Sequence, residues 1–419
     1  MTNEAPPRKP VGLRLNRRLF PGIGSTLILA ILFLHMLLLG MTQLVVPLYS
    51  LSLGASEVVL GVITGAFGVA GILLSIVSSV LSDYLGRRPM ILVAFVFWIG
   101  VGVLNLLAPP FLWLVGGQVL VGMADLCLWV AAMAYLTGVT SQGRHAEIMS
   151  WGGGLMGLGL AVGPVLGGLV ARLVGFQPAF MLVVLLGVLG LALSYKLPST
   201  KLPMAERGAF LHRLSLSHRR ALGLVRGNGS HVFGPMRMAV LVMALGTASW
   251  VAVGRSFYVA YLDNLGFSTE VIGLLTTLRA GATTVAQFGF AFLANRLGVV
   301  VTALSGVAIG GLALALTPFL TTAPVLALVG CLGNGADRLR NPGMFTLIAE
   351  STDRDSRALA FALLNTAWAA TTTVLPPVLG LIAERTALSA TFLLVGPFVA
   401  ASSILLYVWN RRAASELSR

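Results

Sequence analysis

Long apolar runs separated by short polar breaks run through the whole chain. Each run is about 20 residues or more, the length that a membrane-crossing helix needs. The runs cover residues 25–50, 58–84, 89–108, 111–139, 146–172, 178–196, 237–262, 269–296, 299–320, 323–349, 358–383 and 387–409. The pattern predicts an all-α integral membrane protein with twelve transmembrane helices, six on each side of a polar linker.

The composition indicates that lipid, and not water, surrounds these helices. Hydrophobic residues make up 57% of the chain and charged residues 10%, with a mean hydropathy of +0.92. A soluble domain carries about 25% charged residues. A net charge of +14 is also typical of nucleic-acid binders, but here the basic residues gather in a tail, a few loops and one linker. We expect a lipid bilayer and no nucleic-acid partner.

The basic residues also predict the orientation. Five lie in the segment 1–24 and eight lie at 196–237, and cytoplasmic segments are the ones enriched in Lys and Arg. No cleavable signal peptide is expected, because the first apolar run is long enough to cross a bilayer. We therefore expect a multi-pass protein of the plasma (inner) membrane with both termini cytoplasmic. Its expected parts are a tail (1–24), an N-terminal bundle (25–196), a linker (197–236), a C-terminal bundle (237–410) and a second tail (411–419).

The second half of the chain repeats the first. One constant shift pairs Tyr49 with Tyr261 and Gly54 with Gly266, and a shift that is longer by a single position pairs Pro164 with Pro377. Six helices separate the copies, so both halves have the same orientation and form a parallel repeat. Transporters with this symmetry hold their substrate between the halves near mid-membrane.

Two motifs carry a resemblance to a known family. The first is Asp83-x-x-Gly86-Arg87-Arg88, after the second run, and the second is Gly159-x-x-x-Gly163-Pro164-x-x-Gly167-Gly168, in the fifth. The first resembles the loop motif of the major facilitator superfamily, and the second resembles the helix 5 signature of its proton-driven drug antiporters. The resemblance implies the major facilitator fold, transport by alternating access, and export.

The residue types in each motif can also be explained by their physical properties. Arg87 and Arg88 suit the negative end of a helix dipole, and Gly86 allows a tight turn. The resemblance implies that Asp83 latches the inner gate against helix 11, where Ser356 is a candidate cap; a role in topology alone is the alternative. The glycines of helix 5 favour close helix packing, with or without a role in transport.

Six charged residues lie well inside predicted spans, away from the span ends, where each costs at least about 2.5–3.5 kcal/mol near the bilayer centre unless it faces a cavity or a partner. They are Asp125, Arg255, Arg279, Asp337, Arg338 and Arg340. Asp125 and Arg338 lie near the midplane and are related by the longer of the two repeat shifts. We interpret Asp125 as the group that couples transport to protons and competes with substrate for Arg338, with Asp337 as the next candidate.

Other polar residues complete the expected substrate cavity. Its members are Arg255, Arg279, Arg338, Arg340, His35, Gln43, Gln118 and Tyr258. Several have a plainer alternative: Asp337 and Arg340 neutralise each other at i, i+3, Arg255 extends to the interface, and His35 and Gln43 pack helices. Gln118 stands where antiporters of this type have an arginine, so that arginine's coupling role is not carried over. The embedded charges sum to +2, which favours an anionic or zwitterionic substrate.

We interpret the chain as a monomeric secondary transporter that exports a small organic compound in exchange for protons. It is expected to be no enzyme and to hold no cofactor or metal. Neither Cys127 nor Cys331 suggests a disulfide. None of the three lysines follows a glycine, so a phosphate-binding loop for ATP is absent. The alternatives are uptake of an organic anion, movement of a lipid, or a receptor that transports nothing.

Overall fold

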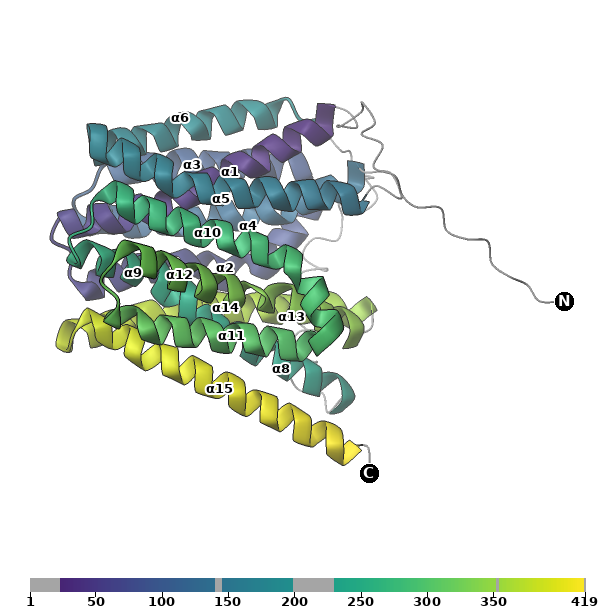
Figure 1. The fold of residues 1–419 in the computed structure, drawn as a ribbon. Coiled ribbons are helices and arrows are strands. Elements are labelled where there is room, and N and C mark those ends of the chain that lie inside the picture. The colour runs from purple at the N-terminus through teal and green to yellow at the C-terminus, as the bar shows by residue number, and fades with distance from the viewer. Residues whose placement is uncertain (1–22, 140–144, 199–229, 352–353, 418–419) are drawn as a thin grey trace, which may run out of the picture.

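The computed structural model describes residues 23–139, 145–198, 230–351 and 354–417, and the side chains at 24–73, 85–136, 151–198, 238–348 and 364–410. All the regular secondary structure in these residues is helical (Figure 1). Most of the first tail and of the linker predicted from the sequence lies outside the described residues, and so does the side chain of Ser356.

The first six apolar runs form six helices, each long enough to cross a membrane. They are α1 (Ile23–Ser52), α2 (Glu57–Leu85), α3 (Arg87–Leu106), α4 (Phe111–Val139), α5 (His145–Val174) and α6 (Phe176–Tyr195). Tight turns separate α2 from α3 and α5 from α6, and Gly86 and Gly175 provide the positive φ angles there.

The later runs form a second set of spans, two of which are interrupted. The elements are α8 (Ser230–Gly246), the π-helical segment η2 (Thr247–Val253), α9 (Gly254–Asn264), α10 (Thr269–Leu297), α11 (Val299–Leu316) with the short turn η3 (Thr317–Phe319), α12 (Ala323–Arg338), α13 (Arg340–Ser351), α14 (Arg354–Arg385) and α15 (Leu388–Leu417). α8, η2 and α9 make one span. α12 and α13 make another, broken at Leu339, just before Asn341-Pro342-Gly343 in the first turn of α13.

Equivalent residues of the two halves adopt the same local structure. Gly86 and Gly298, which the repeat pairs with each other, have φ angles of 93° and 89°. The hydroxyl of Tyr49 donates to the carbonyl of Ala108 at 3.2 Å, and that of Tyr261 donates to the carbonyl of Pro318 at 3.1 Å. Each tyrosine thus ties the first span of its half to the turn that precedes the fourth. The repeat read from the sequence is therefore a structural repeat.

Among the described residues, nine helices are long and apolar enough to cross a membrane. The spans that fall short include α10 and the pair α12 and α13. α10 carries Arg279 and Arg296, and the broken span carries Asp337, Arg338 and Arg340. Charge lowers their mean hydropathy, although their places in the bundle match those of α2 and α4.

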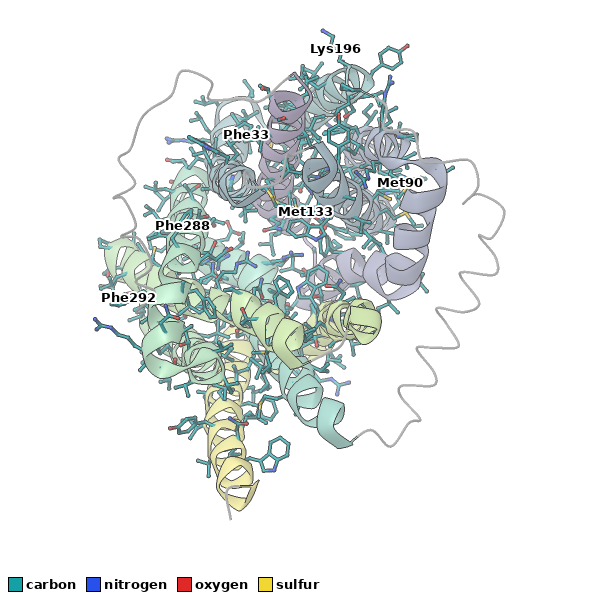
Figure 2. All side chains as sticks on the ribbon, turned by 90° about the vertical axis from the view of Figure 1, so that its right-hand side faces the viewer. Phe33, Met90, Met133, Lys196, Phe288 and Phe292 are labelled. Atoms are coloured by element: carbon teal, nitrogen blue, oxygen red, sulfur yellow. The ribbon has the colours of Figure 1, made fainter. Side chains whose placement is uncertain are left out.

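The two halves lie side by side, with the start of α1 and the end of α15 on one side, which we call the terminal side; the other is the distal side (Figure 1). Seen from the terminal side, the purple and blue helices of the first half lie mostly above the green and yellow helices of the second (Figure 2).

Two seams join the halves, and glycines bring the backbones together in both. In the first, α2 meets α14, and a Cβ atom on Gly61 or Gly65 would collide with the backbone of Pro376 or Thr373. In the second, α5 meets α10, and the hydroxyl of Thr277 donates to the carbonyl of Ala161 at 2.7 Å.

An ion pair between Arg172 and Glu270 joins the distal ends of α5 and α10. Together with the seams, it holds the distal side closed in this structure.

Candidate substrate and proton site

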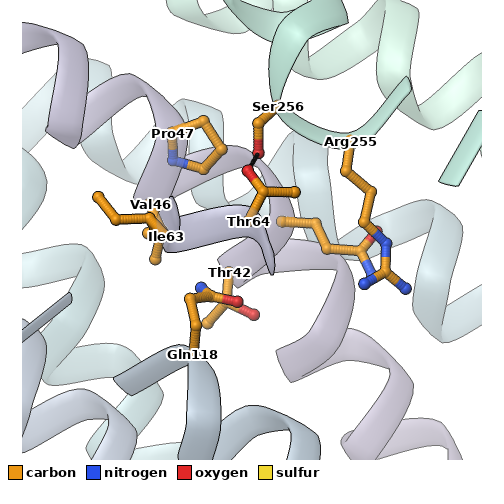
Figure 3. A pocket seen from close by; sticks show the side chains of 9 residues that line it. Thr42, Val46, Pro47, Ile63, Thr64, Gln118, Arg255 and Ser256 are labelled. Carbon is orange, nitrogen blue, oxygen red and sulfur yellow. Dashed lines mark hydrogen bonds between the residues drawn. The ribbon is translucent and has the colours of Figure 1, made fainter. Parts of the chain in front are cut away.

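A pocket lies where the two halves meet in the distal half of the bundle (Figure 3). Its empty space is about 290 Å³, counted to its open mouth. The lining combines three helices of the first half with α9 of the second: Thr42, Gln43, Val46, Pro47, Ile63, Thr64, Gln118, Arg255 and Ser256. Six of these nine residues have polar or charged side chains, so the pocket offers hydrogen-bonding groups to a small polar molecule.

A direct hydrogen bond crosses the pocket from one half to the other. The Thr64 and Ser256 hydroxyl oxygens are hydrogen-bonded at 2.6 Å, and both side chains are buried (Figure 3). Thr64 donates its single proton to the carbonyl of Leu60, so Ser256 donates to Thr64 and the two hydroxyls form a short chain. This bond must break whenever the halves separate around the pocket.

Arg255 provides the positive charge of the pocket. Its guanidinium lies over the ring of Phe67, 4.2 Å from the centroid, so a residue of the second half stacks on one of the first. Arg255 interacts electrostatically with Asp125, which attracts it, and with Arg338, which repels it. With the described residues it makes no hydrogen bond or ion pair, and its donors are free for a ligand.

Asp125, on α4, is bonded to a histidine. Its Oδ1 lies 3.0 Å from Nε2 of His35 on α1. The other ring nitrogen of His35, Nδ1, accepts a hydrogen bond of 3.0 Å from the indole N–H of Trp98 on α3. His35 is 1% exposed and the Asp125 side chain 25% exposed, so only the carboxylate end of this chain reaches open space.

The sequence-based pairing of Asp125 with Arg338 is not made among the described side chains. Arg338 instead interacts electrostatically with Asp337 and Arg340 on its own interrupted span.

Asp337 and Arg340 form a buried pair at the break between α12 and α13. Their closest charged atoms are 3.4 Å apart, and both side chains are almost fully buried. The hydroxyl of Ser249, in η2, is 3.4 Å from the other oxygen of Asp337, and Arg340 donates to the side chain of Asn341 at 3.1 Å. The i, i+3 neutralisation considered for this pair is therefore present.

Arg279 and Tyr258 lie together within the second half, away from the residues that line the pocket. The guanidinium is 4.5 Å from the ring centroid of Tyr258 and 5.3 Å from that of Trp250, and it donates to the carbonyl of Gly254 at 2.6 Å. This arginine joins α10 to η2 and α9, and its side chain is 7% exposed.

The helix 5 motif packs α5 on two neighbours. Gly159, Gly163 and Gly167 face α1, where a Cβ atom on Gly163 would meet the backbone of Leu37, Gly40 and Met41. Gly168 faces α10, close to the carbonyl of Thr269, and the carbonyl of Pro164 lies close to Gly273 of the same helix. The motif thus serves both the first bundle and the seam between the halves.

The loop motif is described only in part. The side chain of Asp83 lies outside the described residues, so the latch stays a prediction. Gly86 makes the expected turn, and Arg88 lies over the ring of Tyr195, 5.0 Å from its centroid, while donating to the carbonyl of the same residue. Arg88 therefore ties the start of α3 to the end of α6.

Sequence reasoning missed Trp98 and six residues that line the pocket: Thr42, Val46, Pro47, Ile63, Thr64 and Ser256. Trp98 gave no signal, since a tryptophan in an apolar run is ordinary. Thr64 and Ser256 look like the small polar residues that any helix interface contains. A buried histidine needs two partners, and that requirement is the only signal that could have pointed to Trp98.

Two like bundles of membrane-crossing helices around a shared polar pocket define a membrane transporter. The family model described as Major Facilitator Superfamily matches residues 28–262 and again 239–419. The chain belongs to the major facilitator superfamily, whose members are transporters and not enzymes.

Comparisons with individual proteins agree with this family. The inner membrane transport protein YajR of Escherichia coli (strain K12) is 26% identical over 167 residues, which are 40% of this chain and 34% of that protein. The match therefore spans about a third of that relative.

Two solved transporter structures share the fold. A crystal structure of a mutant of the nucleoside transporter NupG superimposes with a TM-score of 0.75 at 14% identity, covering 92% of this chain and 99% of that one. The human organic anion transporter MFSD10 (TETRAN) gives 0.64 at 18% identity, covering 91% and 98%.

Proposed function

We propose that this protein is a proton-coupled exporter of a small zwitterionic or anionic organic compound. The observation that supports the proposal best is the distribution of charge around the pocket. A partly exposed carboxylate from the first half, Asp125, faces the partly buried Arg255 of the second half, and Arg338 lies within electrostatic range of the same arginine.

The other embedded charges are already engaged. Asp337 and Arg340 pair with each other, and Arg279 is held by a carbonyl and two aromatic rings. Asp125, Arg255 and Arg338 remain, with a net charge of +1 when the carboxylate is ionised. Buried or half-buried charges without a partner are costly in a membrane, so a ligand that supplies the missing negative charge gains affinity from them.

The same three groups suggest how exchange with protons works. A zwitterion places its anionic end on the arginines and its cationic end on the Asp125 carboxylate. A proton on Asp125 removes the site for the cationic end, so substrate and proton bind in alternation. Alternating binding at one site, opened to each side in turn, gives exchange of one for the other.

A purely anionic substrate favours the second candidate, which is uptake together with a proton. Protonation of Asp125 removes a negative charge near the arginines, so an anion then binds more tightly and the two travel together. The electrostatic interaction between Arg255 and Asp125 supports this alternative. The export direction rests on the resemblance of the helix 5 motif to that of antiporters. The likeness to a nucleoside transporter and an organic anion transporter shows the fold and does not choose between them.

A matched set of ligands tests both candidates. Thermal stabilisation of the purified protein is measured with an amino-acid-type zwitterion, its N-acylated anion, its esterified cation and its neutral amide ester, at several values of pH. Exchange predicts that the zwitterion stabilises most and that acid weakens its effect. Uptake predicts that the anion stabilises most and that acid strengthens its effect. Equal stabilisation by all four compounds contradicts the proposed role of the charges.

The direction is read from transport itself. The best-stabilising compound is offered to everted membrane vesicles with and without a pH gradient. Accumulation that requires acid inside the vesicles indicates export in exchange for protons. Accumulation in right-side-out vesicles that requires acid outside indicates uptake.

The orientation and the latch remain part of the proposal. The positive-inside rule places the terminal side in the cytoplasm of a cell with an inner membrane. Asp83 then stabilises the state closed to the cytoplasm. Asp83→Asn is expected to increase labelling of cysteines introduced into the cytoplasmic vestibule, and unchanged labelling contradicts the latch.

A further inference from the structure

The indole of Trp98 restricts the protonation of His35. An indole nitrogen can only donate a hydrogen bond, and Trp98 Nε1 lies 3.0 Å from His35 Nδ1. Nδ1 must therefore accept, and the proton of a neutral imidazole must lie on Nε2. That proton points at Oδ1 of Asp125, 3.0 Å away. The indole thus donates to the imidazole, and the imidazole donates to the carboxylate.

Protonation of His35 conflicts with this geometry. An imidazolium carries N–H groups on both nitrogens, so its Nδ1–H would face the N–H of Trp98 with no acceptor between them. The two rings have little room to move apart and so separate the facing N–H groups, because Trp98 is 0% exposed and His35 is 1% exposed. A free imidazole takes up a proton near pH 6.5, within the range where a proton-driven transporter works.

The charged groups around His35 come from few elements. Asp125 on α4 is its direct partner, and Arg255 on α9 interacts with Asp125 from the other half, with Arg338 beyond it. In the described parts of α5 and α6, which pack on α1, the titratable side chains are Arg172 and Tyr195, and both lie at the helix ends. No further group among the described side chains of these two helices offers His35 a proton.

We propose that Trp98 is a positioning residue that keeps His35 neutral, so that the coupling proton binds to Asp125 and not to His35. The inference rests on the proposed function in one respect, which is that Asp125 is the proton site. Its chemistry is simple: a proton from water adds to the free oxygen of Asp125, while Oδ1 keeps its hydrogen bond from His35. Without Trp98, His35 charges first and holds Asp125 ionised as half of an ion pair.

The protonation state of His35 can be read directly by nitrogen NMR. The chain has five histidines, so the full-length protein is labelled with nitrogen-15 in the imidazole rings and His35 is identified as the signal that is lost in His35→Gln. We expect one protonated nitrogen and one bare nitrogen from about pH 5 to about pH 8. A wild-type His35 that becomes doubly protonated within this range overturns the proposal.

Trp98→Phe removes the indole N–H and keeps an aromatic ring in the same place. In this variant His35 is expected to become doubly protonated as the pH is lowered from about 8 to about 5. Trp250→Phe is the matched control, because Trp250 is also buried but donates to the carbonyl of Gly310. The control is expected to leave the His35 spectrum unchanged. If Trp98→Phe does not fold, the wild-type spectrum alone decides.

Proton binding by Asp125 provides the second measurement, with the proton itself as the probe. Infrared spectra recorded at successive values of pH show a protonated-carboxyl band that is absent in Asp125→Asn. Trp98→Phe is expected to shift the appearance of this band to lower pH by about one unit or more, as an adjacent positive charge does. The double variant Trp98→Phe with His35→Gln is expected to restore it, because glutamine donates to Asp125 from the position of Nε2 but cannot charge.

The outcomes separate the inference from the function on which it rests. An unchanged band in Trp98→Phe, or a shift that His35→Gln does not reverse, overturns the positioning role. If instead the His35 spectrum behaves as expected but Asp125→Asn still transports uphill, the proposed function fails and the restraint on His35 stands.

Discussion

The two halves of this transporter contain related carboxylates in opposite environments. α4 begins at Phe111 and α12 at Ala323, and the register that pairs these two helix starts also pairs Asp125 with Asp337. The Asp125 side chain faces His35 and is 25% exposed, whereas the Asp337 side chain faces an arginine on its own span and is 3% exposed. An embedded carboxylate is available for proton exchange only where no fixed cation neutralises it.

The difference extends to the helices that carry the two groups. α4 is continuous, and its carboxylate bonds His35 of α1, which in turn accepts a hydrogen bond from Trp98 of α3. The equivalent span of the second half is broken after Arg338, and Arg340 bonds Asp337 across the break. We infer that the first half exchanges protons, whereas the second half pairs its carboxylate with Arg340 and supplies the arginines.

The substitution Asp125→Asn is expected to have the largest effect, which is on transport driven by a pH gradient. Asparagine cannot carry the coupling proton, so accumulation driven by a pH gradient should be lost completely. Binding and downhill exchange should persist, because His35 still finds an acceptor in the amide. Gradient-driven and counterflow transport in proteoliposomes measure the two activities. Uphill transport with the pH dependence of the wild type contradicts the assignment of Asp125.

Asp337→Asn is expected to act on stability instead. The substitution leaves Arg340 buried without its counter-ion, which costs about 3–5 kcal/mol. Thermal unfolding of the purified protein measures this loss, with Asp125→Asn as the control, since the cation nearest to Asp125 is only partly buried. Replacing both members, Asp337→Leu with Arg340→Met, should recover most of the stability. A stable Asp337→Asn that has lost coupling contradicts the comparison.

Arg255→Gln and Arg279→Gln should separate a binding arginine from a packing arginine. Arg255 has free donors at the pocket, and the loss of one charge-assisted hydrogen bond to an anionic group lowers affinity about tenfold to a hundredfold. Arg279 already bonds Gly254 and stacks on two rings, so its replacement should lower the melting temperature with little change in affinity. Titration with the best-stabilising ligand measures both variants. Equal losses of affinity imply that both arginines reach the substrate.

The smallest effect is expected at the seam between α2 and α14. A methyl group on Gly65 collides with the carbonyl of Thr373, and overpacking of this kind costs about 1–3 kcal/mol. Gly65→Ala should therefore shift the population away from the state closed on the distal side. Distances between spin labels on α2 and α14 measure the shift. Gly153→Ala is the control, because a Cβ atom there has no neighbour within 4 Å. If the two variants give identical distances, close packing at this seam does not control the population of the closed state.

The sequence predicts the fold well because a membrane leaves few alternatives. Apolar runs of spanning length define the helices, and Gly54, Gly86, Gly266 and Gly298 mark equivalent turns in the two halves. The break near Asn341 follows from residues that interrupt any helix. None of these inferences requires knowledge of which helices touch.

The site was predicted only in part, for the opposite reason. Hydropathy alone identifies Asp125 as a costly group that needs a partner. The repeat suggested Arg338 as that partner, whereas the side chain that bonds Asp125 in the structure is His35. That contact depends on the distance between α1 and α4, which no local pattern encodes. The link from His35 to Trp98 depends in turn on a third helix.

The ion pair between Arg172 and Glu270 has a consequence for the solution on the distal side. Its side chains are 57% and 31% exposed, and exposed ion pairs contribute about 0–1 kcal/mol and are screened by salt. Closure on that side thus depends mainly on the uncharged glycine seams. A change in the salinity of the surrounding medium should leave the balance between open and closed states almost unaltered.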